Sequence, residues 1–104
     1  MVIREWRGRS TRERSAEYPK HFRDTVVPQL RRVPGFVGAY LCERQEVERV
    51  EFLVMTQWTS MDAVRAFAGT DPERAVVEPG AIAALMDYDE IVRHYQVLED
   101  VSIW

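Results

Sequence analysis

Asparagine is absent from this chain of 104 residues, lysine occurs once and cysteine occurs once, at Cys42. A single cysteine excludes a disulfide bond within the chain. The longest uninterrupted apolar run is the six residues 81–86, whereas a membrane-spanning helix needs about 20. The first residues alternate charged and bulky side chains and show no signal-peptide pattern. We therefore expect a cytoplasmic protein with no membrane partner.

The signatures of common cofactor and metal sites are also missing. Five glycines are scattered singly, so the sequence has no glycine-rich loop for a nucleotide phosphate. There is no His-Glu-x-x-His motif and no cysteine pair for zinc. The two histidines, His21 and His94, have no metal-ligand spacing, and we expect His21 to be exposed and without a role. Cys42 lies in a hydrophobic strand pattern, which favours a buried, inert thiol. We predict no metal site and no cofactor.

The composition is that of one globular domain over residues 1–104. With 46% hydrophobic and 30% charged residues, the chain is neither a disordered tail nor a coiled-coil rod. The net charge of −3 is unevenly distributed, because residues 1–32 hold nine basic and four acidic side chains. Those basic residues alternate with acidic ones, so we expect them to pair within the protein or with a partner subunit, and we predict no nucleic-acid binding.

Side-chain periodicity predicts the order β-α-β-β-α-β. Alternation indicates strands at 2–7, 36–42, 50–58 and 89–98, the middle two forming a hairpin. A capping box at 10–13 indicates the first helix, which Pro19 and Pro28 interrupt. Ser60 begins the second helix and Gly69 ends it, after which short helices are expected near 71–73 and 81–88. This order predicts an α+β, ferredoxin-like fold with a four-stranded antiparallel sheet and helices on one face.

The other face of such a sheet exposes alternating apolar residues. A second copy of the chain covers that face most simply, so we expect a two-fold homodimer.

The strands also present candidates for chemistry. His94 lies in the middle of the last strand and is the candidate catalytic base, although a histidine satisfied by structural hydrogen bonds is an open alternative. Arg4 and Arg93 lie in the two terminal strands and are candidates for holding a ligand oxyanion. The aromatic residues Trp6, Trp58 and Phe67 are expected to form the walls of a pocket for a flat, apolar ligand.

Five segments together resemble the antibiotic biosynthesis monooxygenase family of the dimeric α+β barrel superfamily. They are WRGR at 6–9, VPGFVGA at 33–39, EFLVMTQWTS at 51–60, AFAG at 66–69 and VRHY at 92–95. The resemblance covers residues 2–98. It implies a homodimer in which two sheets close into a barrel, with a ligand pocket between helices and sheet in each subunit.

The resemblance also implies a range of activities. Some members oxidise aromatic polyketide phenols to quinones with O₂ and neither metal nor flavin, and others degrade haem. Haem-degrading relatives carry an Asn, a Trp and a His in the pocket, and the last two correspond to about Phe67 and Val77 here. The quinone-forming relatives also use an Asn, which this chain lacks. Haem degradation is therefore not expected.

Three functions remain open. The first is a cofactor-independent monooxygenase acting on a small aromatic or polyketide-like substrate, with His94 as base and Arg4 or Arg93 holding the substrate anion. The second is an isomerase or cyclase that uses the same base without O₂. The third is a non-catalytic dimer that binds a small apolar or aromatic molecule. Oxygen uptake separates the first function from the second, and the third predicts a filled core with no cavity and a histidine whose loss costs stability only.

Overall fold

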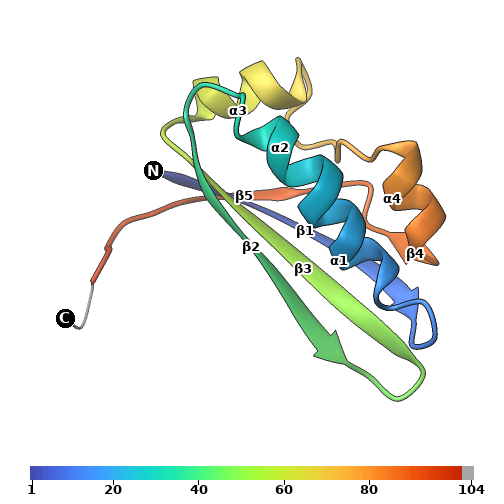
Figure 1. The fold of residues 1–104 in the computed structure, drawn as a ribbon. Coiled ribbons are helices and arrows are strands. Elements are labelled where there is room, and N and C mark those ends of the chain that lie inside the picture. Colours follow the sequence, from blue (N-terminus) through green and yellow to red (C-terminus); the bar gives the residue numbers. More distant parts are fainter. Residues whose placement is uncertain (102–104) are drawn as a thin grey trace.

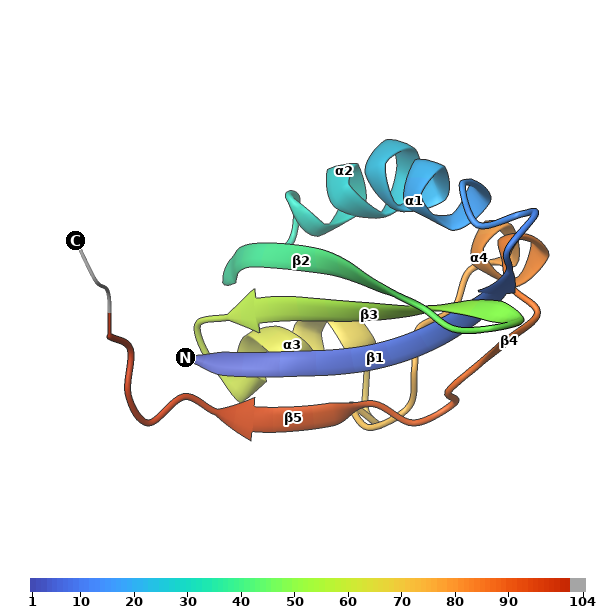
Figure 2. The same cartoon turned by 90° about the horizontal axis from the view of Figure 1, so that it is seen from below.

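The computed structural model describes residues 1–101 and has the α+β, ferredoxin-like fold predicted from the sequence. All its strands belong to one antiparallel sheet, and the helices cover one face of that sheet (Figure 1). Figure 2 looks onto the opposite face, where the strands lie in the open and α3 lies behind them.

Strand β1 (Val2–Thr11) is the central strand of the sheet. It pairs with β3 (Arg49–Trp58) over its full length, from Val2 opposite Trp58 to Thr11 opposite Arg49. β3 forms the predicted hairpin with β2 (Phe36–Gln45). The other edge of β1 pairs with two short strands, β4 (Asp87–Tyr88) and β5 (Arg93–Gln96). The single last strand predicted at 89–98 is thus wrong in detail, because residues 89–92 leave the sheet between two short strands.

The first helix of the chain is continuous and has a π-helical centre. It consists of α1 (Glu17–His21), the π-helical segment η1 (Phe22–Val26) and α2 (Val27–Leu30). At the end of η1 the amide of Val27 donates to the carbonyl of Phe22, five residues back. Pro28 has no amide hydrogen and cannot donate the hydrogen bond of a regular α-helix. The wider π-helical turn occurs directly before this residue.

The predicted capping box at 10–13 is wrong. Ser10 is buried in β1, opposite Val50, and its hydroxyl donates to the carbonyl of Thr11. β1 also continues through Gly8, where an added Cβ would lie 2.9 Å from a methyl carbon of Leu85. Glycine at position 8 therefore permits close packing on the helical layer and does not end the strand.

Two further helices follow β3 in the chain, α3 (Met61–Ala68) and α4 (Pro79–Ala84). As predicted, Ser60 caps α3, its hydroxyl accepting from the amide of Ala63 at 3.2 Å, and Gly69 ends the helix with φ of 90°. The short helix expected near 71–73 is not formed, and the chain crosses irregularly from α3 to α4.

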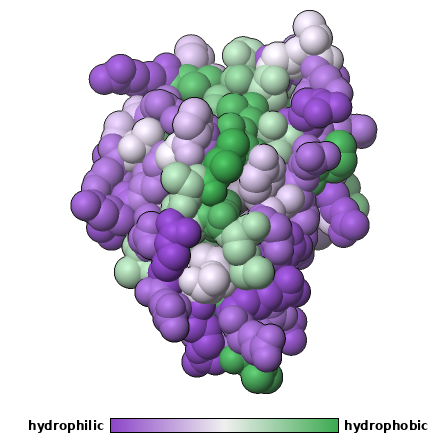
Figure 3. Space-filling model, turned by 90° about the vertical axis from the view of Figure 1, so that its right-hand side faces the viewer, coloured by the Kyte–Doolittle hydropathy of each residue, from purple (hydrophilic) through white to green (hydrophobic). Residues whose placement is uncertain are grey.

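The core lies between the sheet and the helices. Its largest fully buried side chains include Trp58, Phe52 and Leu30. The side of the molecule that carries α1 and α4 shows a hydrophobic band between hydrophilic flanks (Figure 3). Within residues 1–101 no helix has the length and apolar character to cross a membrane.

Candidate functional site

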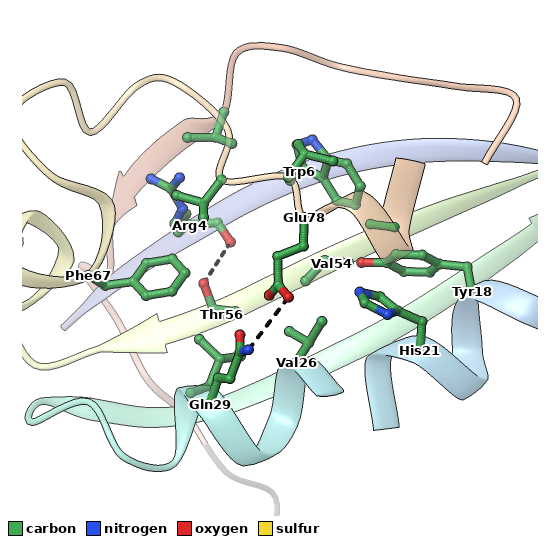
Figure 4. A pocket seen from close by; sticks show the side chains of 15 residues that line it. Arg4, Trp6, Tyr18, His21, Val26, Gln29, Val54, Thr56, Phe67 and Glu78 are labelled. Atoms are coloured by element: carbon green, nitrogen blue, oxygen red, sulfur yellow. Dashed lines mark hydrogen bonds between the residues drawn. The ribbon is translucent and has the colours of Figure 1, made fainter. Parts of the chain in front are cut away.

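A cavity of about 100 Å³ lies between the helices and the sheet (Figure 4). Most of its lining is apolar or aromatic, with a few polar side chains from β1, α1, α2 and the segment before α4. The residues that line it are Arg4, Trp6, Tyr18, His21, Val26, Gln29, Leu30, Val54, Thr56, Phe67, Val76, Val77, Glu78, Ala81 and Val92. A dry apolar cavity of roughly 150 Å³ holds a benzene molecule, so this cavity has the scale of one aromatic ring.

Arg4 is a buried cation without a carboxylate partner in the described part of the chain. Its residue is 5% exposed, and no ion pair among residues 1–101 includes it. Its guanidinium donates to the carbonyls of Pro72 and Arg74 instead. Burial lowers the pKa of Arg4 to about 10, so the side chain stays protonated at neutral pH.

His94 supports Arg4 from the neighbouring strand. The two residues are paired across β1 and β5, and Nη1 of Arg4 lies 3.0 Å from Nε2 of His94. A guanidinium can only donate hydrogen bonds, so Nε2 accepts and the imidazole is neutral, with its proton on Nδ1. Burial and the charge of Arg4 lower the pKa of His94, while Glu73 acts in the opposite direction.

Aromatic rings form the wall beside Arg4. The guanidinium carbon of Arg4 lies 5.8 Å from the ring centre of Phe67, within cation–π range. Behind Phe67, the indole of Trp58 stacks on it with ring centres 5.3 Å apart. The indole nitrogen of Trp58 donates to the hydroxyl of Thr56, which in turn donates to the backbone carbonyl of Arg4. This chain of contacts fixes β1 at the position of Arg4.

Polar side chains gather at the other end of the cavity, where α1 approaches α4. In Figure 4, Tyr18 and His21 lie on the side of the cavity away from Arg4 and Phe67, and the carboxylate of Glu78 lies between these two groups, next to Gln29. The amide of Gln29 donates to the carboxylate of Glu78 at 3.5 Å, which joins α2 to the segment before α4. Burial, and then the charge of Glu78, raise the pKa of Tyr18, so its phenol stays protonated.

The structure brings three of the sequence-predicted residues to the cavity wall, namely Arg4, Trp6 and Phe67. Trp58 is fully buried behind Phe67 and does not line the cavity. Arg93 is exposed, and its place next to His94 in β5 puts its side chain on the other face of the sheet. His94 contacts Arg4 and not the cavity, so its predicted role as a base stays a prediction.

Two expectations about single residues are corrected. His21 is half-buried, not exposed, and it lines the cavity. Its position three residues after Tyr18 on one helix face is the sequence signal that could have placed it there. Cys42 is exposed on the open face of the sheet, not buried, because β2 is the edge strand.

Within residues 1–101 no group of three or more His, Cys, Asp or Glu side chains is arranged to hold a metal ion. The charged or titratable side chains that line the cavity are those of Arg4, Tyr18, His21 and Glu78.

Comparisons with solved structures identify proteins of the same fold. A protein from Deinococcus radiodurans assigned to the antibiotic biosynthesis monooxygenases has a TM-score of 0.67 and 17% identity, over 100% of this chain and 99% of that one. The heme-degrader MhuD from Mycobacterium tuberculosis, with two hemes bound, has a TM-score of 0.66 and 20% identity over 98% and 100%. SnoaB, a cofactor-independent oxygenase from Streptomyces nogalater, has a TM-score of 0.61 and 18% identity over 96% of both chains.

At these identities the solved structures establish the fold alone. No curated protein matches the sequence. The family model for antibiotic biosynthesis monooxygenase, however, matches residues 1–79, more than half of the chain. The resemblance noted in the sequence is thereby confirmed, and the chain belongs to the antibiotic biosynthesis monooxygenase family.

Proposed function

We propose that this protein is a cofactor-independent monooxygenase that oxidises a small aromatic anion with O₂. The observation that supports this proposal is the Arg4 guanidinium, buried without a carboxylate partner at the wall of an aromatic-lined cavity. Buried charges in proteins are normally paired. Arg4 has five N–H donors, and its contacts with Pro72, Arg74 and His94 use three of them. Two donors remain for the oxyanion of a ligand.

The size of the cavity narrows the substrate to a single aromatic ring. A cavity of about 100 Å³ is closer in size to one that holds a single ring than to one that would hold a fused polycyclic system or a porphyrin. We therefore favour a monocyclic phenol and do not propose haem degradation.

The reaction requires only the substrate, O₂ and a proton acceptor. The deprotonated phenol passes an electron to O₂, and the two radicals combine to form a C–O bond at the ring carbon opposite the phenol oxygen. Loss of the proton on that carbon breaks the O–O bond, leaving a second carbonyl and releasing water. Phenol and O₂ thus give quinone and water, and the substrate supplies all four electrons. Arg4 would stabilise the phenolate, and the apolar walls would exclude water.

His94 would act through Arg4 as a positioning residue. Its Nε2 already accepts from Arg4, so it has no lone pair free on that atom to take a substrate proton. By holding Nη1 from the side of β5, His94 would fix the guanidinium while leaving its remaining N–H groups free for the ligand. Phe67 and Trp6 would form the walls against which the ring packs.

We also propose that the open face of the sheet is the contact surface of a homodimer. Tyr40 is 61% exposed and Tyr95 46% exposed on this face, and half-buried Leu53 and Met55 lie between them. Burying such a surface against its own copy is the usual way to cover an open sheet. Native mass spectrometry should give twice the chain mass, and a monomer at micromolar concentration would contradict the proposal.

Oxygen uptake tests the proposed reaction directly. Monocyclic phenols should cause protein-dependent O₂ consumption, whereas their methyl ethers, which cannot form an oxyanion, should cause none. Arg4→Met should lower the rate at least about a hundredfold, as loss of a single oxyanion donor does in other enzymes. Arg23→Met, exposed on the first helix and outside the cavity lining, should leave the rate unchanged. Ligand binding without O₂ consumption by any phenol would contradict the oxygenase and favour the binding-protein or isomerase alternative.

A further inference from the structure

The imidazole of His21 carries a buried nitrogen without a partner. Its Nε2 is the one buried side-chain nitrogen or oxygen among residues 1–101 that has no hydrogen bond. Such a group destabilises the folded protein when nothing compensates for its lost hydration. Buried polar atoms without partners are rare in folded proteins, and each calls for an explanation in terms of strain, water or function.

The ring of His21 is held in place by its neighbours. An added Cβ on Gly80 would lie 2.7 Å from Cε1 and 2.8 Å from Nδ1, so the first turn of α4 packs directly against the imidazole. On the other side, the ring centre of Tyr18 lies 6.1 Å away. The imidazole therefore cannot turn freely to find a partner for Nε2, and its orientation is a property of the packing of α1 on α4.

The cavity has polar groups at both ends. Arg4 and Phe67 lie at one end and His21 lies at the other with Tyr18, while the Glu78 carboxylate lies between the two ends (Figure 4). His21 also lines a surface groove on its outer side. The charged and titratable groups that share one or other of these spaces with His21 are Arg4, Tyr18 and Glu78 in the cavity, and Arg14, Glu17, Lys20 and Asp24 in the groove.

We propose that Nε2 of His21 is a ligand contact, and that the ligand is an aromatic ring with a hydrogen-bond donor opposite its oxyanion. With the oxyanion on Arg4, the far end of the ring would extend along the cavity toward the end that His21 lines. A donor at that position would satisfy the unpartnered Nε2. In the proposed reaction, the hydroperoxide that forms on the ring carbon opposite the phenol oxygen would be such a donor. This inference rests on the anion site of the proposed function.

Two carboxylates of nearly equal shape test the contact. 4-Hydroxybenzoate has a hydroxyl opposite its carboxylate, and 4-methylbenzoate has a methyl group there. Neither needs to react, so binding is measured by calorimetry on the intact protein. The wild type should bind the hydroxyl compound about fivefold more tightly, the value of one net hydrogen bond. His21→Phe should bind both equally, while His21→Gln, which keeps an acceptor, should retain part of the preference.

Glu78→Gln is the matched comparison, because Glu78 is another acceptor that lines the cavity. It should keep the preference for the hydroxyl compound. Loss of the preference in Glu78→Gln with retention in His21→Phe would overturn the assignment to His21.

The two proposals fail in different ways. If His21 is not a contact but Arg4 binds anions, the wild type will bind both carboxylates with equal affinity, and Arg4→Met will weaken both. If the anion site itself is wrong, Arg4→Met will bind both compounds as well as the wild type does. If the wild type prefers the hydroxyl compound and His21→Phe keeps the same preference, the inference about His21 is contradicted while the anion site stands.

Discussion

Arg4 and His94 face each other across the pair of strands β1 and β5, with Nη1 of Arg4 3.0 Å from Nε2 of His94. Both side chains point to the helical face, where Arg4 also donates to two carbonyls of the segment between α3 and α4. One guanidinium thus connects the edge of the sheet to the irregular segment that covers the cavity. The arrangement needs a neutral imidazole, because a protonated His94 would have no lone pair for Arg4.

This contact makes stability depend on pH in a predictable direction. The pKa of His94 is lowered in the folded protein, by burial and by Arg4, below its ordinary value of 6.5. As the pH falls through 6.5 the unfolded chain binds the proton first, so the free energy of unfolding decreases until the folded-state pKa is passed. Above that range, His94 makes no pH-dependent contribution.

His94→Gln should flatten this dependence. Glutamine keeps an acceptor for Arg4 but does not titrate, so the decrease below neutral pH should be smaller by up to about 1.4 kcal/mol per pH unit. Urea unfolding at a series of pH values measures it. Identical pH profiles of the variant and the wild type would show that His94 titrates as it does in the unfolded chain.

Ala81→Leu should fill the cavity. Ala81 is 5% exposed on α4 and lines the cavity, so a larger side chain occupies the space intended for the ring. Benzoate binding should weaken at least about tenfold, while the free energy of unfolding should change by less than about 1 kcal/mol, because the added carbons enter existing space. Ala83→Leu, exposed on the same helix, is the control and should bind benzoate normally. Unaltered binding by Ala81→Leu would place the ligand elsewhere.

Gly35 and Gly69 should respond differently to alanine. Both have positive φ, 87° and 90°, which costs a side chain about 1–3 kcal/mol. A Cβ on Gly35 would lie 2.5 Å from the Cβ of Ala63, whereas nothing lies within 4 Å of a Cβ on Gly69. Gly35→Ala should therefore be the more destabilising, by about 1–3 kcal/mol of overpacking. Equal unfolding midpoints for the two variants would contradict the close approach of β2 to α3.

Much of the fold follows from patterns visible in the sequence. Alternation along β1 puts Arg4 and Trp6 on one face of a strand, and the same rule puts His94 and Arg93 on opposite faces. Ser60 and Gly69 marked the ends of α3 because their effects are local: a side-chain hydrogen bond and a positive φ. Features that depend on one or two neighbouring residues can therefore be predicted from the sequence.

Features that depend on pairing between distant segments could not be predicted from the sequence. The pattern at 10–13 fits a capping box, but the pairing of Ser10 with Val50 extends β1 past it. Similarly, nothing in residues 89–92 shows that they leave the sheet. The spacing of His21 from Tyr18 indicates which helix face it shares, but the packing of Gly80 against its ring joins segments 59 positions apart and has no signal in the sequence.

The claim on which this account depends is that Arg4 binds an anion in the cavity. Benzoate and benzamide have nearly the same shape, and only benzoate is charged at neutral pH. Calorimetric titration of the protein should give an affinity for benzoate about tenfold or more above that for benzamide, and Arg4→Met should abolish the difference. Equal binding of the two compounds by the wild type, or an unchanged preference for benzoate in Arg4→Met, would contradict it.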